Sequence, residues 1–138
     1  METEKSRVKG YYASRTTIEG EVIVITKPLD LLSIEPLSGT FESAHEHGGK
    51  NIKDKILVAP CLCGATIAEF IPLFLSLTGN KPKAFVTTTT HAYTPIMSGC
   101  IISETPLIYG LDKKLAEKLE TGDKVKIDAK NEEIAIQK

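Results

Sequence analysis

The sequence contains no tryptophan, only three cysteines among 138 residues, and a net charge of only −1. Because aromatic residues make up just 6% of the chain, a platform that stacks on single-stranded nucleic acid is not expected. The near balance of 17 basic and 18 acidic residues also argues against binding by neutralisation of phosphates. Together these shortages argue against nucleic acid as a partner.

Long hydrophobic runs and a secretory leader are also missing. No apolar run reaches the ~18 residues that a membrane-spanning helix needs. Residues 1–9 are polar and charged, which is not the pattern of a signal peptide. An odd number of cysteines without a signal predicts no disulfide framework, so we expect a cytoplasmic protein that is not bound to a membrane.

What the chain does contain is an ordinary globular composition, with 41% hydrophobic and 25% charged residues. A chain of this length is enough for one domain with its own core. We therefore expect residues 1–8 to form a flexible N-terminus and residues 9–138 to form a single domain.

Apolar, β-branched runs predict strands that alternate with helices. The expected strands are Ile18–Ile25, Lys55–Ala59, Ala84–Thr88, Leu107–Tyr109, Lys124–Asp128 and Glu133–Ile136. The expected helices are Ala65–Leu77 with a kink at Pro72, Thr94–Ser103, and Lys113–Leu119 with Asp112 as its N-cap. The order predicts a mixed α/β fold in which helices pack on a central mixed sheet or barrel.

A polar segment, Glu42–Lys50, is expected to be an exposed loop because it carries a Gly-Gly pair and few apolar residues. It contains His45 and His47, whose spacing is compatible with a metal or acid–base cluster. In a loop of this composition, two solvated histidines are the favoured interpretation. No metal site is therefore assigned to this chain.

The segment from Ile56 to Ile67 is the most informative, because a buried strand leads through a glycine loop into a predicted helix. The first N–H groups of a helix lack intrahelical partners and attract a carboxylate or phosphate. Gly64 would let the backbone approach such a ligand, and the Thr66 hydroxyl would lie in the first turn. The alternative is that both residues simply begin a structural helix.

Two cysteines, Cys61 and Cys63, flank one residue in this loop. That spacing matches ordinary zinc sites poorly, so small buried hydrophobic residues are the favoured interpretation. A reactive thiolate is the second interpretation, because a helix N-terminus lowers the pKa of a thiol.

Taken in order, several segments resemble the small subunit of aconitase-X-type dehydratases, a group that includes archaeal phosphomevalonate dehydratase. The resemblance runs from about Lys9 to Ile136. Its anchors are Ile18–Glu21, Pro28-Leu29, Ile34–Gly39, His45 before Gly49, Ile56–Pro60 followed by Gly64, Pro82–Ala84, Gly99, Ile102–Pro106 and Thr121–Val125.

The resemblance implies a swivelling β/β/α domain that closes over a large catalytic subunit, in a heterodimer or a higher assembly. It implies no cofactor in this chain and an iron–sulphur cluster or iron in the large subunit, acting as a Lewis acid on the leaving hydroxyl. The family reaction is dehydration, and in the family a serine just after the loop glycine takes the proton.

The loop departs from the family pattern at three places, the last of which is Ala68-Glu69 where the family has Gly-Ser. Ala65 stands where the family has its serine, and Cys63 stands where the family has a basic residue. We expect a hydro-lyase subunit acting on a small anionic hydroxy acid such as phosphomevalonate, with Thr66 and Cys63 catalytic. Gly64, Ala65 and His45 are the expected substrate-binding residues. The alternatives are a non-catalytic binding or scaffold subunit on the same fold, and a metal or redox protein that depends on Cys61 and Cys63.

Overall fold

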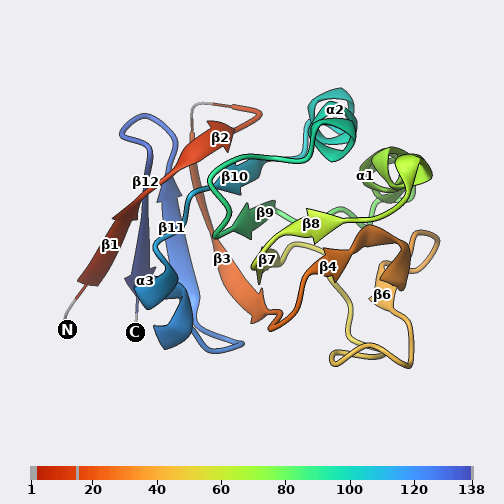
Figure 1. Cartoon of the computed structure of the whole chain (residues 1–138), viewed down its shortest axis with the longest axis horizontal. Coiled ribbons are helices and arrows are strands. Elements are labelled where there is room, and N and C mark those ends of the chain that lie inside the picture. Colours follow the sequence, from red (N-terminus) through yellow and green to blue (C-terminus); the bar gives the residue numbers. More distant parts are fainter. Residues whose placement is uncertain (1–2, 15, 138) are drawn as a thin grey trace.

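The structure is a computed structural model that describes residues 3–14 and 16–137, and an eight-stranded mixed sheet forms its centre (Figure 1). The sheet order is β1-β12-β11-β3-β7-β9-β10-β2. Its strands are β1 (Thr3–Arg7), β2 (Lys9–Tyr11), β3 (Thr17–Val24), β7 (Ile56–Ala59), β9 (Ala84–Thr87), β10 (Leu107–Tyr109), β11 (Lys124–Asp128) and β12 (Glu133–Gln137).

Short elements complete the fold. Two small strand pairs are β4 (Leu29–Asp30) with β8 (Leu62–Cys63), and β5 (Ile34–Glu35) with β6 (Thr40–Phe41). The helices are the 3₁₀ turns η1 (Leu31–Ser33) and η2 (Thr66–Glu69), and the α-helices α1 (Phe70–Leu77), α2 (Thr94–Ser103) and α3 (Lys113–Lys118). The predicted mixed α/β fold is confirmed.

The neighbouring strands β3, β7, β9 and β10 run parallel, and other elements cover both of their faces. Successive residues of a strand point to opposite faces, so each such strand contributes to two cores in turn. In β7, Leu57 packs in one core, whereas Ile56 and Val58 pack in the other. This is why the sequence of β7 is continuously apolar rather than alternating.

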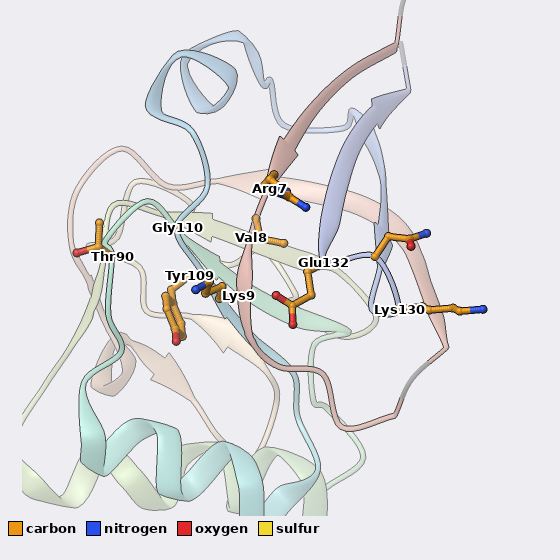
Figure 2. A pocket seen from close by; sticks show the side chains of 9 residues that line it. Arg7, Val8, Lys9, Thr90, Tyr109, Gly110, Lys130 and Glu132 are labelled. Atoms are coloured by element: carbon orange, nitrogen blue, oxygen red, sulfur yellow. The ribbon is translucent and has the colours of Figure 1, made fainter.

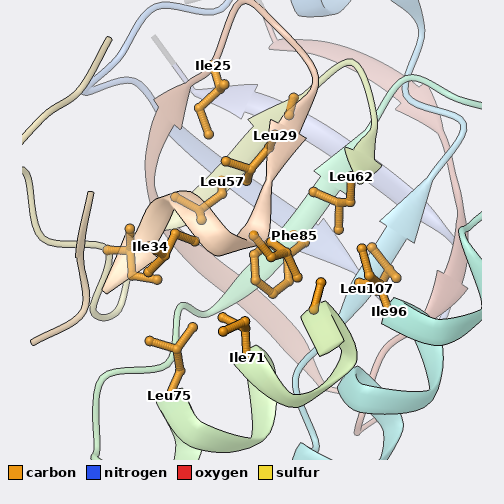
Figure 3. Close-up of a cluster of buried hydrophobic side chains, with 14 of the residues drawn as sticks. Ile25, Leu29, Ile34, Leu57, Leu62, Ile71, Leu75, Phe85, Ile96 and Leu107 are labelled. Atoms are coloured by element: carbon orange, nitrogen blue, oxygen red, sulfur yellow. The ribbon is translucent and has the colours of Figure 1, made fainter. Parts of the chain in front are cut away.

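The first core lies between the parallel strands and the layer that holds α1, α2 and β4 (Figure 3). Phe85 and Leu57 come from the sheet, Ile71 and Leu75 from α1, and Ile96 from α2. Burying a side chain of this size stabilises the fold by about 1.5–3 kcal/mol, so this layer holds α1 and α2 firmly on the sheet.

The second core lies on the opposite face, where α3 packs and where the antiparallel strands β11 and β12 add their inward side chains. Val125 and Ile127 are buried, whereas Lys126 between them is exposed. In the hairpin of β11 and β12, Ile127 lies opposite Ile134, as the alternation of apolar and polar residues in the sequence predicts. Asp112 accepts a hydrogen bond from the Lys114 N–H at 3.3 Å, which confirms it as the N-cap of α3.

The N-terminal segment is where the prediction is wrong. Residues 3–7, expected to be flexible within residues 1–8, form β1 and pair with β12 along its whole length. After the buried Val8, the chain continues as β2, which pairs with β10 at the other end of the sheet. One continuous segment therefore supplies both end strands, and the sheet is nearly closed. Residues 1–2 of that prediction lie outside the described residues.

The helix expected over Ala65–Leu77 is in fact two helices. A 3₁₀ turn, η2, comes first, and α1 begins only at Phe70. Pro72 therefore lies in the first turn of α1, where its missing N–H has no helical partner to lose. The predicted kink at Pro72 is replaced by a change of helix type one turn earlier.

Within the two described ranges, no helix is both long enough and apolar enough to cross a bilayer. The helix predicted over Thr94–Ser103 is confirmed, as are the strands β7, β9, β10 and β11 to within one residue.

The contact between α2 and η2 depends on Gly99. A Cβ atom at this position would overlap the carbonyl oxygen of Glu69 and would lie 2.9 Å from its carbonyl carbon. Because both groups are backbone, neither can rotate away. Gly99 therefore lets α2 lie directly against the segment that follows the Cys61–Thr66 loop.

We expect Gly99→Ala to lower the free energy of unfolding by about 2 kcal/mol or more, because overpacked helices must separate. Urea unfolding followed by circular dichroism measures this loss. Ser98→Ala on the exposed side of the same helix is the matched control and should change stability by less than about 0.5 kcal/mol. Equal stability of the two variants would contradict this account of the helix contact.

Candidate functional site

The candidate site lies at the carboxyl ends of β7 and β9, the edge at which parallel sheets commonly bind ligands. β7 ends at Ala59, and Pro60 leads into the segment of residues 61–66, which we call the site loop. β9 ends at Thr87 and leads into Thr88–His91. These two segments are adjacent, since the Thr89 N–H donates a hydrogen bond to the Pro60 carbonyl at 3.2 Å.

The site loop is held by the short strand pair β4–β8 rather than by the main sheet. Asp30 lies opposite Cys63 in this pair, and the Leu29 N–H donates to the Cys61 carbonyl at 2.9 Å. Figure 1 shows the two strands side by side, between the sheet and α1. Pairing thus brings Asp30 to the site loop from a position far away in the sequence.

Gly64 is required at its position in the loop. Its φ of +140° is a backbone conformation that other residues rarely adopt, and a Cβ would lie 2.7 Å from the Ala68 Cβ. The same Cβ would lie 3.0 Å from the Asp30 Oδ1. The loop backbone therefore passes directly beside the Asp30 carboxylate.

Ala65 is the N-cap of η2 but offers no side-chain oxygen to the first N–H groups of that helix. Thr66 is exposed, and its hydroxyl makes no hydrogen bond within the described residues. Because η2 has only four residues, its dipole is far smaller than that of the long helix predicted here. The predicted attraction of an anion would thus rest on individual N–H groups.

Cys63 is half-buried, and its thiol pKa is raised, first by burial and then by the nearby Asp30 carboxylate and Cys61. The sequence offered a lowered pKa as one interpretation, because a long helix was expected to begin beside this residue. The short η2 supplies little of that effect, and a neighbouring carboxylate opposes it. At neutral pH the Cys63 side chain is therefore a thiol, not a thiolate.

A cavity of about 320 Å³ lies beside the site loop. Leu62, Ile96 and Leu107 form its apolar part, and Cys61, Thr89 and His91 are among its polar lining. Such a combination of an apolar floor with a few polar groups is typical of small-molecule sites. His91 is exposed and follows four threonines in the sequence. Only the alignment of β7 with β9 reveals that it shares a cavity with Cys61.

A larger cavity, of about 640 Å³, lies near the point where β1 continues into β2 (Figure 2). Lys9, Tyr109 and Glu132 line it, and none of the residues predicted for the site does. Burial, Glu132 and Tyr109 raise the pKa of the nearby Tyr12 to about 12. We assign the site to the smaller cavity, because Cys61 and Leu62 of the site loop line it. The predicted residues themselves, Cys63, Gly64, Ala65, Thr66 and His45, are not among its lining residues.

His45 and His47 are not the two solvated side chains that the sequence favoured. The His45 ring stacks on Phe41 with centroids 4.2 Å apart, and its Nδ1 accepts the His47 N–H at 3.0 Å. His47 Nε2 donates to the Val24 carbonyl at 2.7 Å. Burial lowers the pKa of His45, so its ring is neutral at pH 7. The pair fixes the loop of residues 42–50 to the end of β3.

In residues 3–14 and 16–137, no group of three or more His, Cys, Asp or Glu side chains is placed to hold a metal ion. Cys100 is buried, and burial raises its thiol pKa to about 12. None of the three cysteines is paired.

The helices beside the site loop present an unusual surface. α1 and α2 contain no charged residue, although both lie on the outside of the molecule. Apart from Tyr93, the N-cap of α2, the large apolar side chains exposed in the described residues come from α1, α2, η1, η2 and Leu37. We call them the apolar face: Leu32, Leu37, Ile67, Phe70, Phe74, Leu77, Ile101 and Ile102. Surfaces of this kind mark sites of protein association.

Comparison with known proteins finds similar chains of known family. A profile of the aconitase X swivel domain matches residues 7–136. The phosphomevalonate dehydratase small subunit of Pyrococcus abyssi is 37% identical over 133 residues, covering 94% of this chain and 98% of that protein. The corresponding protein of Methanosarcina acetivorans is 36% identical, covering 88% and 85%.

A solved structure is similar over almost the whole chain. The crystal structure of Thermococcus kodakaraensis aconitase X in its holo form superposes with a TM-score of 0.81 and 34% identity. The match covers 96% of this chain and 99% of that one. The fold that the resemblance implied, a swivelling domain with a central mixed sheet, is confirmed.

The pKa of Cys63 can be tested by alkylation with iodoacetamide in a Cys61→Ser variant, where the buried Cys100 reacts slowly. We expect the pH midpoint of the reaction rate to lie above that of an unhindered peptide thiol, because burial and Asp30 disfavour the thiolate. Asp30→Asn in the same background should move the midpoint down. A midpoint below that of the free peptide would contradict the geometry described for the site loop.

Proposed function

The chain belongs to the aconitase X swivel-domain family, and from that premise we propose that it is the small subunit of a hydro-lyase in the cytoplasm. The substrate we propose is a small anionic hydroxy acid such as phosphomevalonate. Relatives that cover most of this chain are named phosphomevalonate dehydratase small subunits, which supports both the reaction class and the substrate.

The observation that carries this proposal is the position of the site loop at the border of the apolar face. Ile67 follows the loop directly in η2 and is 58% exposed, and the face continues along α1 to Leu77, which is 73% exposed. A partner seated on α1 and α2 would also cover the site loop. The site of a shared reaction would thus be formed between the two chains, with water excluded.

The partner is a large catalytic subunit, as the names of the relatives imply. We propose that it holds the iron–sulphur cluster or iron centre, which would act as a Lewis acid on the leaving hydroxyl. This chain would contribute the site loop, with Gly64 and the Ala65 N–H near the anionic group of the substrate. Cys63 and Thr66 would contact the reacting part, and His45 is proposed to contribute from the loop of residues 42–50.

A second candidate function is a non-catalytic binding or scaffold subunit. Ala65 favours it, because the side chain at the N-cap of η2 can neither donate nor accept a proton. The protonated state of Cys63 favours it as well, since a thiol is a poor base. A subunit of this kind would still bind its large partner through the apolar face.

Binding through the apolar face predicts that a charge placed on it weakens the complex. We expect Leu77→Asp and Ile102→Asp each to raise the dissociation constant for the large subunit at least about tenfold, because a carboxylate would be buried without a partner. Isothermal titration calorimetry with the large subunit of the same organism measures this. Gln137→Glu, which adds the same charge on β12, is the control and should bind normally.

The proposed reaction predicts that the co-expressed pair removes water from phosphomevalonate, which mass spectrometry of the product detects. We expect Thr66→Val to lower turnover by roughly 10²-fold, because a hydrogen bond to the reacting group is lost. Thr66→Ser keeps the hydroxyl and should retain most of the activity. A tightly associated wild-type pair that dehydrates no phosphorylated or other hydroxy acid would support the scaffold function instead.

A further inference from the structure

A dehydratase needs a group that removes a proton from carbon, and the site loop contains no good one. Ala65 has no proton acceptor, and within the described residues the Thr66 hydroxyl has no hydrogen-bond partner that could take its proton and activate it. The Cys63 thiol is half-buried and protonated. A proton acceptor for the proposed reaction has therefore to come from outside residues 61–66.

Asp30 is a carboxylate that the fold brings to the site loop beside Cys63 and Gly64, whereas His91 lines the cavity beside Cys61. It lies opposite Cys63 in the β4–β8 pair. Its Oδ1 is 3.0 Å from the position that a Cβ on Gly64 would occupy. The missing side chain of Gly64 is therefore what allows the carboxylate to stand against the loop backbone.

The carboxylate is fixed at one oxygen and open at the other. Oδ1 accepts the Leu32 N–H at 2.9 Å and so caps η1, which orients the side chain. Within the described residues, the second oxygen has no hydrogen-bond or ion-pair partner. A carboxylate with one anchored and one open oxygen has the geometry required of a positioned base.

The place of Asp30 relative to the apolar face adds to this argument. Asp30 is exposed in the isolated chain, yet Leu32, which donates to it, belongs to the apolar face. A large subunit seated on that face would remove water from the carboxylate. The groups that face Asp30 are the Cys63 thiol from β8 and the Leu32 N–H from η1, and neither carries a positive charge to offset this loss of water.

We propose that the carboxylate of Asp30 is the base that takes the proton from the substrate carbon, which rests on the proposed function of the chain as a hydro-lyase subunit. The substrate C–H bond breaks, its proton passes to the open oxygen of Asp30, and its electron pair forms the carbon–carbon double bond. The C–O bond on the neighbouring carbon breaks, and the leaving hydroxide takes up a proton to give water. Release of the proton from Asp30 restores the carboxylate, so one substrate gives one alkene and one water.

The test uses the co-expressed pair and the variant Asp30→Asn. An asparagine oxygen still accepts the Leu32 N–H, so the cap of η1 is kept while the base is lost. We expect kcat to fall by about 10²–10⁴-fold with little change in KM, the effect typical of a lost general base. The fall of wild-type kcat at low pH, where the carboxylate is protonated, should disappear in the residual activity of the variant.

Asp112→Asn is the matched control. Asp112 is also an exposed aspartate whose Oδ1 accepts the N–H two residues on, but it caps α3 on the opposite side of the sheet. This variant should keep the wild-type kcat and pH profile. Asp30→Glu, which restores a carboxylate at a shifted position, should recover part of the lost rate.

The outcomes separate the two proposals. Wild-type turnover in Asp30→Asn, with an unchanged acid limb, would overturn the role of Asp30 and leave the hydro-lyase function intact. An equal loss in Asp30→Asn and Asp112→Asn would also overturn it, because loss of a cap would then explain both. A wild-type pair without dehydratase activity would overturn the hydro-lyase function and, with it, the proposed role of Asp30 as the base.

Discussion

Burial of the parallel strands on both faces is the constraint that shapes the rest of this molecule. Strands β3, β7 and β9 place successive side chains alternately into two cores, so each face needs its own covering layer. On one face that layer consists of β4, η1, α1 and α2, and on the other it consists of α3 with the inward side of the hairpin. The site loop exists because the chain must leave β7 and reach the first of these layers.

The parts of the fold that can be predicted from the sequence are those whose periodicity is set by burial. The apolar run of β7 and the alternation of β11 each reflect a face that must be covered, and both strands are where the pattern puts them. β1 is different, since its sequence Thr-Glu-Lys-Ser-Arg carries no apolar alternation. It becomes a strand because β12 offers it an open edge, which is a tertiary cause that no local pattern contains.

The candidate site shows the same division. The loop with Gly64 and Thr66 can be found from the sequence, because a strand, a glycine and a helix follow one another there. Asp30 cannot be found in this way, since it reaches the loop through a strand pair of only two residues on each side. For a related reason, the lowered thiol pKa, the second interpretation for Cys63, is not found. Burial and the Asp30 carboxylate raise the pKa of Cys63, and both come from the fold rather than from the sequence of the loop.

The way in which the sheet closes has a consequence for how the chain folds. β1 and β2 are made first during synthesis, but their partners β12 and β10 lie near the other end of the chain. Neither strand can pair until its distant partner has been synthesised, and contacts between such distant segments form slowly. In a nascent chain, β1 and β2 are therefore unpaired while α1 and α2, which contain no charged residues, are already exposed. The risk that this chain aggregates is therefore greatest in the period before the sheet closes.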